Sequence, residues 1–213
     1  KAIKRQYDCR LKLTEQKIKV VYNSSEFAFS IARSREEVRS ELGIKPEELL
    51  VIMVARLDPW KDFNTLLIAA KKIKSKSEDF KFVICGGGEL RKYLEKKIKA
   101  LNLQSTVFLI GEKKNVAEYI NASDISVLST TGEGFSNVIM ESMALAKPVI
   151  ATDVGGNREL IGDANECGFL IKLKDSSSLS DILLSLKDDR EKMNLVGRKA
   201  RERIFKLCDK QAN

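Results

Sequence analysis

The stretch LLVIMVARLDPWKDFNTLLIAAKKIKSKSEDFKFVICGGG, residues 49–88, decides the fold class of this chain. It contains two short apolar runs rich in β-branched residues, at 50–55 and 82–85, of the kind typical of strands buried on both faces. Between the runs, apolar side chains recur at helical spacing opposite a lysine-rich face: Phe63, Leu66, Leu67, Ala70 and Ile73. The stretch therefore predicts a strand, an amphipathic helix and a second strand in succession.

The same alternation continues along the chain. Further apolar runs occur at 107–110, 125–128, 149–151 and 169–171, and a second helical pattern covers 90–101. Strands that alternate with helices indicate right-handed crossovers and a parallel sheet. We expect an α/β fold with a doubly wound, Rossmann-like parallel sheet, whose ligands lie beyond the carboxyl ends of the strands.

The composition narrows the class of protein. The chain has 213 residues, of which 43% are hydrophobic and 32% charged, and no apolar run approaches the ~18–20 residues of a membrane span. Its net charge of +8 is compatible with an anionic partner and equally with a solvated, lysine-rich surface. These values exclude disordered, collagen-like and transmembrane classes.

Cysteine and histidine usage limits the chemistry. The four cysteines lie far apart and form no CxxC pair, which indicates a reducing compartment and a cytoplasmic location: Cys9, Cys85, Cys167 and Cys208. Histidine is absent, so His-based acid–base catalysis and Ser-His or Cys-His nucleophiles are excluded. We predict that the chain holds no metal.

Two loops follow the first and second predicted strands. In the first, Arg56 and Lys61 could both face a phosphate, although two solvated cations would give the same pattern. Trp60 beside them could stack on a base or pack within the loop. The second loop contains Gly86, Gly87 and Gly88, which permit a sharp turn or a close ligand, but no G-x-G-x-x-G fingerprint.

The loop after the fourth predicted strand is richer in polar groups. Ser136 or Asn137 can cap a helix over 138–146, whose first N–H groups form an anion site. Glu133 precedes that helix between two glycines, and Glu141 lies on its second turn. Two carboxylates could thus bracket one ligand. Alternatively, Glu133 is a turn residue and Glu141 interacts with the helix dipole.

The two glutamates carry a family resemblance. Their eight-residue spacing, in EGFSNVIME at 133–141, resembles the E-x7-E signature of retaining glycosyltransferases of family 4, which have the GT-B fold. Supporting motifs occur in the family's order: VARL at 54–57 with Lys61, GGGE at 86–89 and PVIATDVGGN at 148–157. The resemblance covers only the C-terminal, donor-binding half of GT-B. It implies a linker or helical segment at 1–16, a Rossmann-like domain at 17–205 and a truncated tail at 206–213.

The resemblance implies a role for individual residues. Arg56 and Lys61 would hold the diphosphate of a nucleotide sugar, and Glu133 would face the donor sugar; these three form the catalytic set. Glu141 would accept hydrogen bonds from the ribose hydroxyls. Seven further residues would surround the donor: Gly86, Gly87, Gly134, Phe135, Ser136, Asn137 and Val138. Since the chain contains no D-x-D pair, we expect no metal and no other cofactor.

The resemblance also implies partners. A nucleotide sugar would be the donor, and an N-terminal domain missing from this chain would hold the glycan, lipid or other acceptor. We therefore expect this chain alone to be inactive, and the full enzyme to serve polysaccharide biosynthesis in the cytoplasm, with peripheral association at the inner face of the membrane. The base, the sugar and the acceptor stay open.

Other functions remain as alternatives. A sugar-nucleotide epimerase can share the architecture. A nucleic-acid binder would use lysines such as Lys71, Lys72, Lys96 and Lys97, but these fall opposite the apolar helix faces, where a solvated surface is favoured, so we expect no nucleic-acid partner. A dehydrogenase is disfavoured because the dinucleotide fingerprint is absent.

Overall fold

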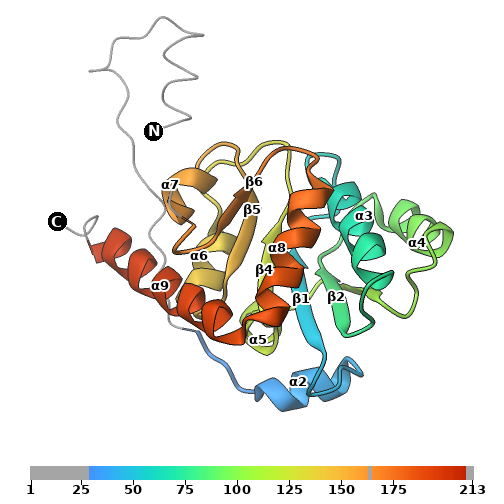
Figure 1. Cartoon of the computed structure of the whole chain (residues 1–213), viewed down its shortest axis with the longest axis horizontal. Coiled ribbons are helices and arrows are strands. Elements are labelled where there is room, and N and C mark those ends of the chain that lie inside the picture. The colour runs from blue at the N-terminus through green and yellow to red at the C-terminus, as the bar shows by residue number, and fades with distance from the viewer. Residues whose placement is uncertain (1–28, 163–164, 210–213) are drawn as a thin grey trace, which may run out of the picture.

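The computed structural model describes residues 29–162 and 165–209, and it places a six-stranded parallel sheet between two layers of helices (Figure 1). The strands are β1 (Leu49–Val54), β2 (Phe80–Cys85), β3 (Val107–Gly111), β4 (Ile125–Leu128), β5 (Val149–Thr152) and β6 (Phe169–Ile171). Each strand coincides with one of the apolar runs of the sequence, so the predicted strands are confirmed.

The strand order is β3-β2-β1-β4-β5-β6, which is the doubly wound arrangement predicted from the sequence. The chain moves outward from β1 to β3, then returns to place β4 on the other side of β1. The carboxyl ends of β1 and β4 therefore adjoin at the point where the winding reverses, and a ligand crevice is expected there.

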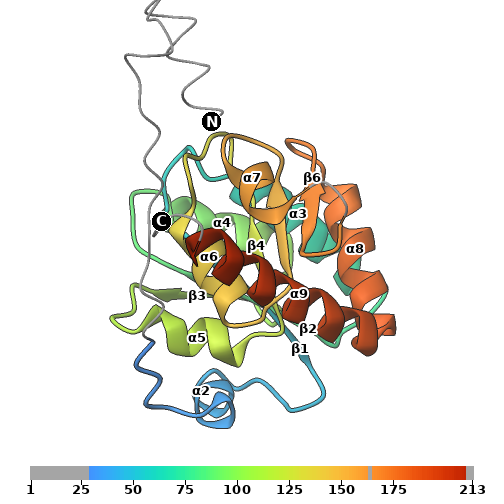
Figure 2. The same ribbon diagram turned by 90° about the vertical axis from the view of Figure 1, so that its left-hand side faces the viewer.

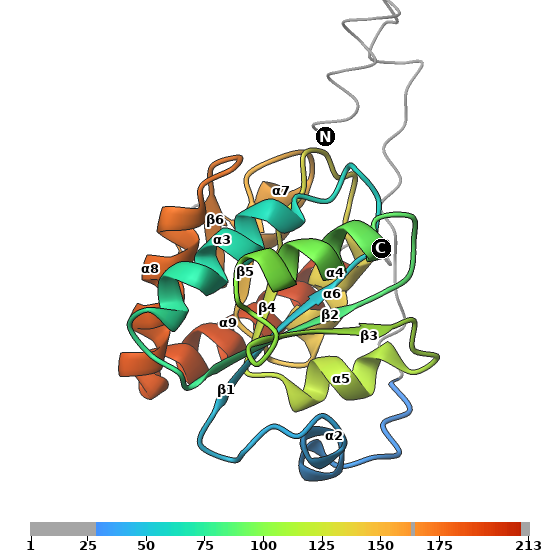
Figure 3. The ribbon, with the colours of Figure 1, turned by 90° about the vertical axis from the view of Figure 1, so that its right-hand side faces the viewer.

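Helices cover both faces of the sheet. They are α2 (Arg35–Glu41), α3 (Phe63–Lys74), α4 (Arg91–Ala100), α5 (Val116–Ala122), α6 (Asn137–Ala144), α7 (Asn157–Ile161), α8 (Ser176–Asp188) and α9 (Arg190–Asp209). Figure 2 shows α5, α6, α7 and α9 in front of the sheet, and Figure 3 shows α3, α4 and α8 in front of the other face. The lysines at 71, 72 and 96 are exposed on these outer helices.

The alternating side chains of β1 divide the core between the two faces. Leu49, Val51 and Met53 belong to the larger buried cluster, while Leu50 and Ile52 belong to a smaller one that also contains residues of α2 and α5. All five are 1% exposed or less. Because successive strand residues point to opposite faces, a strand buried on both sides must be apolar throughout, which explains the continuous run.

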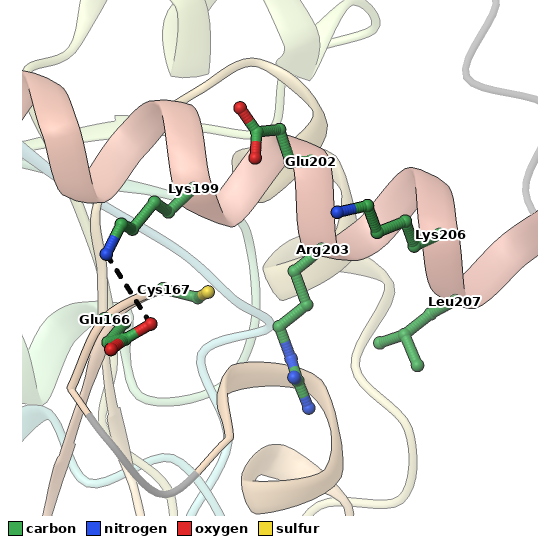
Figure 4. A pocket seen from close by; sticks show the side chains of 7 residues that line it. All are labelled: Glu166, Cys167, Lys199, Glu202, Arg203, Lys206 and Leu207. Atoms are coloured by element: carbon green, nitrogen blue, oxygen red, sulfur yellow. Dashed lines mark ion pairs between the residues drawn. The ribbon is translucent and has the colours of Figure 1, made fainter.

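The C-terminal helix α9 crosses the α6 face and reaches α7. Arg203 projects from α9 and donates hydrogen bonds to the carbonyl oxygens of Glu159 and Leu160 near the end of α7, while Lys199 pairs with Glu166 at 3.5 Å (Figure 4). The helix runs without a break to Asp209, so the boundary expected between residues 205 and 206 falls inside it. The segment expected at 1–16 lies outside the described residues.

Across the described residues, no helix combines the length and the apolarity that crossing a bilayer would require.

Candidate functional site

A cavity of about 470 Å3 opens at the carboxyl ends of β1 and β4. Its walls come from the β1–α3 loop, the β4–α6 loop and the first turn of α6. The lining residues are Val54, Ala55, Arg56, Asp58, Trp60, Lys61, Leu128, Glu133, Phe135, Ser136, Asn137 and Val138. Seven of the eleven residues predicted for the donor site therefore meet in one cavity at the reversal point of the sheet.

The β1–α3 loop supplies both expected cations, and each has a carboxylate partner. Arg56 Nε lies 2.8 Å from Asp58 Oδ2, and Lys61 Nζ lies 2.5 Å from Glu133 Oε2. The Arg56 side chain is 77% exposed, whereas the Lys61 side chain is only 16% exposed. Arg56 is thus an exposed cation, as the alternative interpretation of the sequence allowed, whereas the interpretation of Lys61 as a solvated cation is wrong, because Lys61 is an enclosed group of the cavity wall.

Asp58 is a cavity residue that the sequence analysis missed. Its Oδ1 accepts a hydrogen bond from the Trp60 N–H at 3.0 Å, while its Oδ2 holds Arg56. Burial alone would raise the pKa of Asp58, but these two hydrogen bonds together with the positive charges of Arg56 and Lys61 outweigh burial and lower it. An Asp directly before Pro is a signal for such a turn, because its carboxylate can accept from the backbone N–H two residues further on.

Trp60 is 66% exposed at the cavity wall, so the expectation that it packs within its loop is wrong. Its backbone carbonyl is held by Thr131, whose N–H and hydroxyl donate to it at 2.8 and 3.0 Å. The Thr130 hydroxyl lies 3.0 Å from the same oxygen. Further along, the Asp62 N–H donates to the Ser129 carbonyl at 3.0 Å. These bonds tie together the two loops that carry Lys61 and Glu133.

Helix α6 begins at the cavity. Ser136, one of the two residues predicted to cap it, is its N-cap, and the Ser136 hydroxyl accepts a hydrogen bond from the Ile139 N–H. The positive end of the helix dipole therefore faces the cavity beside Lys61. The helix ends at Ala144, two residues earlier than predicted, because Ala146 adopts a left-handed conformation with φ of +56°.

Glu141 lies outside the cavity lining, although the sequence places it one helical turn after Asn137 on the same side of α6. It is partly buried, and burial raises the pKa of its carboxyl. Within the described residues its carboxylate has no hydrogen-bond or ion-pair partner, although its backbone carbonyl accepts from the Leu145 N–H at 3.0 Å. A partly buried carboxylate without a partner is costly, and a ligand hydroxyl would offset that cost. Its role toward a ribose stays a prediction.

The glycines after β2 have a structural explanation of their own. A Cβ on Gly86 would lie 2.0 Å from the Ala55 carbonyl oxygen, and one on Gly88 would lie 2.5 Å from that of Leu57. The Gly87 carbonyl accepts a hydrogen bond from the Leu57 N–H at 2.7 Å. Neither Gly86 nor Gly87 lines the cavity. The glycine turn instead packs against the backbone of the loop that carries Arg56. Direct contact of Gly86 and Gly87 with a donor stays a prediction.

A second pair of glycines, Gly155 and Gly156, supports Glu133. A Cβ on Gly155 would lie 1.7 Å from the Glu133 carbonyl oxygen, and φ at Gly155 is +56°. The Gly156 N–H donates to the Gly134 carbonyl at 2.8 Å. Gly134 is therefore a backbone partner of this loop and does not line the cavity. Only glycine permits so close an approach, so these residues fix the position of Glu133.

The described part of the chain contains no group of three or more His, Cys, Asp or Glu side chains arranged to hold a metal ion. The charged side chains at the cavity are instead two cations and two carboxylates, and they lie beside a helix start. Such a set can bind an anion through fixed positive groups and can accept hydrogen bonds from hydroxyls.

Sequence comparisons find relatives that are glycosyltransferases. The chain is 29% identical over 188 residues to N-acetyl-alpha-D-glucosaminyl L-malate synthase of Bacillus anthracis, covering 88% of this chain and 49% of the relative. It is 31% identical over 199 residues to N-acetylgalactosamine-N,N'-diacetylbacillosaminyl-diphospho-undecaprenol 4-alpha-N-acetylgalactosaminyltransferase of Campylobacter jejuni, covering 93% of this chain and 52% of the relative. The chain thus spans about half the length of these relatives.

Structural comparison agrees on the fold. A crystal structure of Anabaena HepE in complex with UDP superposes with a TM-score of 0.86 at 23% identity, covering 98% of this chain and 60% of HepE. The same protein has also been crystallised with UDP-glucose. The fold of this chain is accordingly that of one half of a GT-B architecture.

The sequence pattern of the glycosyl transferases group 1 matches residues 34–203, which include every described strand of the sheet and the whole cavity lining. On this match, the chain belongs to the glycosyl transferases group 1 family.

Proposed function

We propose that this chain is the donor-binding domain of a retaining glycosyltransferase and that its cavity holds a nucleoside diphosphate sugar. The observation that carries the proposal is the meeting of Lys61, Glu133 and the α6 N-terminus in one cavity at the reversal point of the sheet. A diphosphate that leaves gains negative charge, which fixed cations and helix N–H groups stabilise.

The proposed roles follow from position. Arg56 and Lys61 bind the diphosphate, Glu133 orients the donor sugar, and Glu141 accepts from the ribose. Because Glu133 orients the sugar in this proposal and does not attack it, the leaving-group oxygen assists the acceptor on the same face of the sugar. A separate N-terminal domain supplies the acceptor. The cytoplasmic location and the association with a membrane face belong to this proposal and are supported only by the sequence.

The test is thermal denaturation of the 213-residue chain with uridine, guanosine, adenosine and cytidine diphosphates. A ligand that binds only the folded state raises the unfolding midpoint by mass action, and one of these should do so. The matching nucleosides serve as controls, because they lack the group that Arg56 and Lys61 would hold. If no diphosphate raises the midpoint, the donor site is assigned wrongly.

Metal independence is tested with the same titration. Since the cations and the helix start neutralise the diphosphate in this proposal, EDTA should leave the dissociation constant unchanged. A tenfold gain in affinity on adding Mg²⁺ or Mn²⁺, about 1.4 kcal/mol, would show that a metal takes part.

Sugar transfer should need more than this chain. Holding an acceptor at attack distance can lower the activation barrier by up to ~7–11 kcal/mol. In a GT-B enzyme the opposing domain holds the acceptor. We expect the chain alone to release no diphosphate from a bound nucleotide sugar, and release to appear when the N-terminal domain of the same parent protein is added. Acceptor-dependent release by the chain alone would show a complete catalytic site.

A further inference from the structure

The cavity is electrically balanced before any ligand arrives. It contains two cations, Arg56 and Lys61, and two carboxylates, Asp58 and Glu133, joined as two ion pairs. A site that attracted a diphosphate by surplus positive charge would leave its cations without carboxylate partners. Binding a diphosphate here must therefore change at least one existing pair.

The two pairs differ in how they can respond. Arg56 is 77% exposed and has five N–H donors, so it can keep Asp58 through Nε and still offer its outer nitrogens to a phosphate. Asp58 is also held by the Trp60 N–H. Lys61 and Glu133 are enclosed, with side chains 16% and 21% exposed, and each is the ion-pair partner of the other.

We infer that Lys61 exchanges partners when the donor binds: its ammonium leaves the Glu133 carboxylate for the diphosphate, and Glu133 is released toward the sugar. This inference rests on the proposed function of the cavity. In this inference the Lys61–Glu133 ion pair breaks only when an anion takes the place of the Glu133 carboxylate. The Arg56–Asp58 ion pair stays intact throughout.

The exchange has a consequence for free nucleoside diphosphate. In the intact donor, the sugar hydroxyls can hydrogen-bond the released carboxylate. A bare diphosphate takes Lys61 but gives Glu133 nothing, which leaves a partly buried charge without compensation. The pair then tends to form again, and the product of the reaction is favoured to leave.

The test measures binding of the diphosphate that gives the largest thermal shift, starting with UDP, to the 213-residue chain. Trp60 is the only tryptophan of the chain and lines the cavity, so its fluorescence reports on the site itself. Glu133→Gln keeps the shape of the side chain but removes the charge that holds Lys61. We expect this variant to bind the bare diphosphate about threefold to tenfold more tightly, mainly through slower dissociation.

Simple repulsion between Glu133 and the diphosphate would also give a gain, so the exchange needs a double-mutant cycle. In a Lys61→Met background the exchange predicts that Glu133→Gln gives less than a twofold gain, whereas repulsion predicts the same gain in both backgrounds. Asp58→Asn is the matched control, since it neutralises the other carboxylate of the cavity. We expect no tighter binding in that variant, because the Arg56–Asp58 pair does not open.

The possible failures are distinct. If the native chain and the Glu133→Gln variant bind none of the four diphosphates, the proposed function is wrong and this inference falls with it. If the native chain binds a diphosphate and Glu133→Gln brings no gain, or the same gain without Lys61, the donor site stands and the exchange is overturned.

Discussion

Strand β4 has a charged cluster near each end, and the two clusters differ in how many partners hold each side chain. At its amino end, Asp124 meets Arg35, Arg39 and Lys147, which we call the amino-end cluster. Beyond its carboxyl end, the pairs Lys61–Glu133 and Arg56–Asp58 line the cavity, and we call these four residues the carboxyl-end cluster. One short strand thus joins two sets of similar side chains.

The amino-end cluster is held from several directions at once. Arg39 is 5% exposed and donates to the backbone carbonyls of Lys45 and Glu48 as well as to Asp124. Asp124 also accepts from the Leu50 N–H at 2.7 Å. The carboxyl-end cluster instead consists of two separate pairs beside a cavity. The comparison teaches that a charged side chain with several hydrogen-bond partners besides its ion pair supports the fold. A charged side chain with a single partner beside a cavity is available to a ligand.

The largest expected effect is on Asp124. Asp124→Ala leaves Arg39 buried beside Arg35 without their carboxylate, which costs about 3–5 kcal/mol for a buried pair. Urea unfolding should show that loss in the free energy of unfolding. At temperatures where the variant is folded, diphosphate affinity should stay within twofold of the native chain. A large loss of affinity without a loss of stability would mean that the amino-end cluster acts on the site.

A smaller effect is expected at Gly155, under the carboxyl-end cluster. Gly155→Ala places a Cβ against the Glu133 carbonyl at a backbone φ of +56°, so the loop must move, at a cost of about 2–4 kcal/mol. We expect diphosphate binding measured by calorimetry to fall together with stability. Gly132→Ala is the control, because a Cβ there meets nothing within 4 Å. Equal behaviour of the two variants would contradict the supporting role of Gly155.

Both cations of the cavity should affect diphosphate binding, and the exposed Arg56 should affect binding far more than folding. Arg56→Ala and Lys61→Ala should each weaken diphosphate binding by about 1.5–3 kcal/mol, the scale of a hydrogen bond to a charged group. The free energy of unfolding should change by less than about 1 kcal/mol for Arg56→Ala, whose side chain is 77% exposed, and by about 1–3 kcal/mol for Lys61→Ala, which leaves the enclosed Glu133 carboxylate without its partner. Calorimetry with the matching nucleoside is the control. Equal losses of affinity for nucleoside and diphosphate would show that Arg56 and Lys61 do not bind the diphosphate.

The sequence predicts the elements of the sheet better than the contacts of the site. Strands can be predicted from the local sequence, because burial on both faces requires an unbroken apolar run such as that of β1. The α6 cap at Ser136 is also local, since a hydroxyl must lie within reach of the next turn. The short helices α5 and α7, with seven and five residues, show too few turns for a clear helical period.

The pairing of the site could not be predicted in this way. Lys61 and Glu133 are 72 positions apart, and only the adjacency of β1 and β4 brings them together. The spacing of Arg56 and Lys61 suggested two cations facing one phosphate, but it carried no information on Asp58 or Glu133 as their partners. Such partners depend on which loops meet at the reversal point of the sheet, which is a property of the whole topology.

The smallest expected effect is a pH dependence at Lys147. Its ammonium donates to the carbonyls of Asn121 and Ser123 at 2.7 and 2.9 Å, at the end of α5. Burial, with a further contribution from the nearby arginines and despite Asp124, lowers the pKa of Lys147 to about 8. An unfolded lysine has a pKa of about 10.4.

Between these two pKa values, the folded chain binds fewer protons at Lys147 than the unfolded chain, so this group makes the free energy of unfolding rise with pH. From pH 7.5 to 9.5 we expect a contribution of about 1–2 kcal/mol. Other groups also titrate there, so the measurement is urea unfolding of the native chain and of Lys147→Met at both values. Arg35 still donates to the Ser123 carbonyl in that variant. The native chain should gain more free energy of unfolding between the two pH values than the variant. An equal gain would show that the Lys147 ammonium is solvated and lies outside the amino-end cluster.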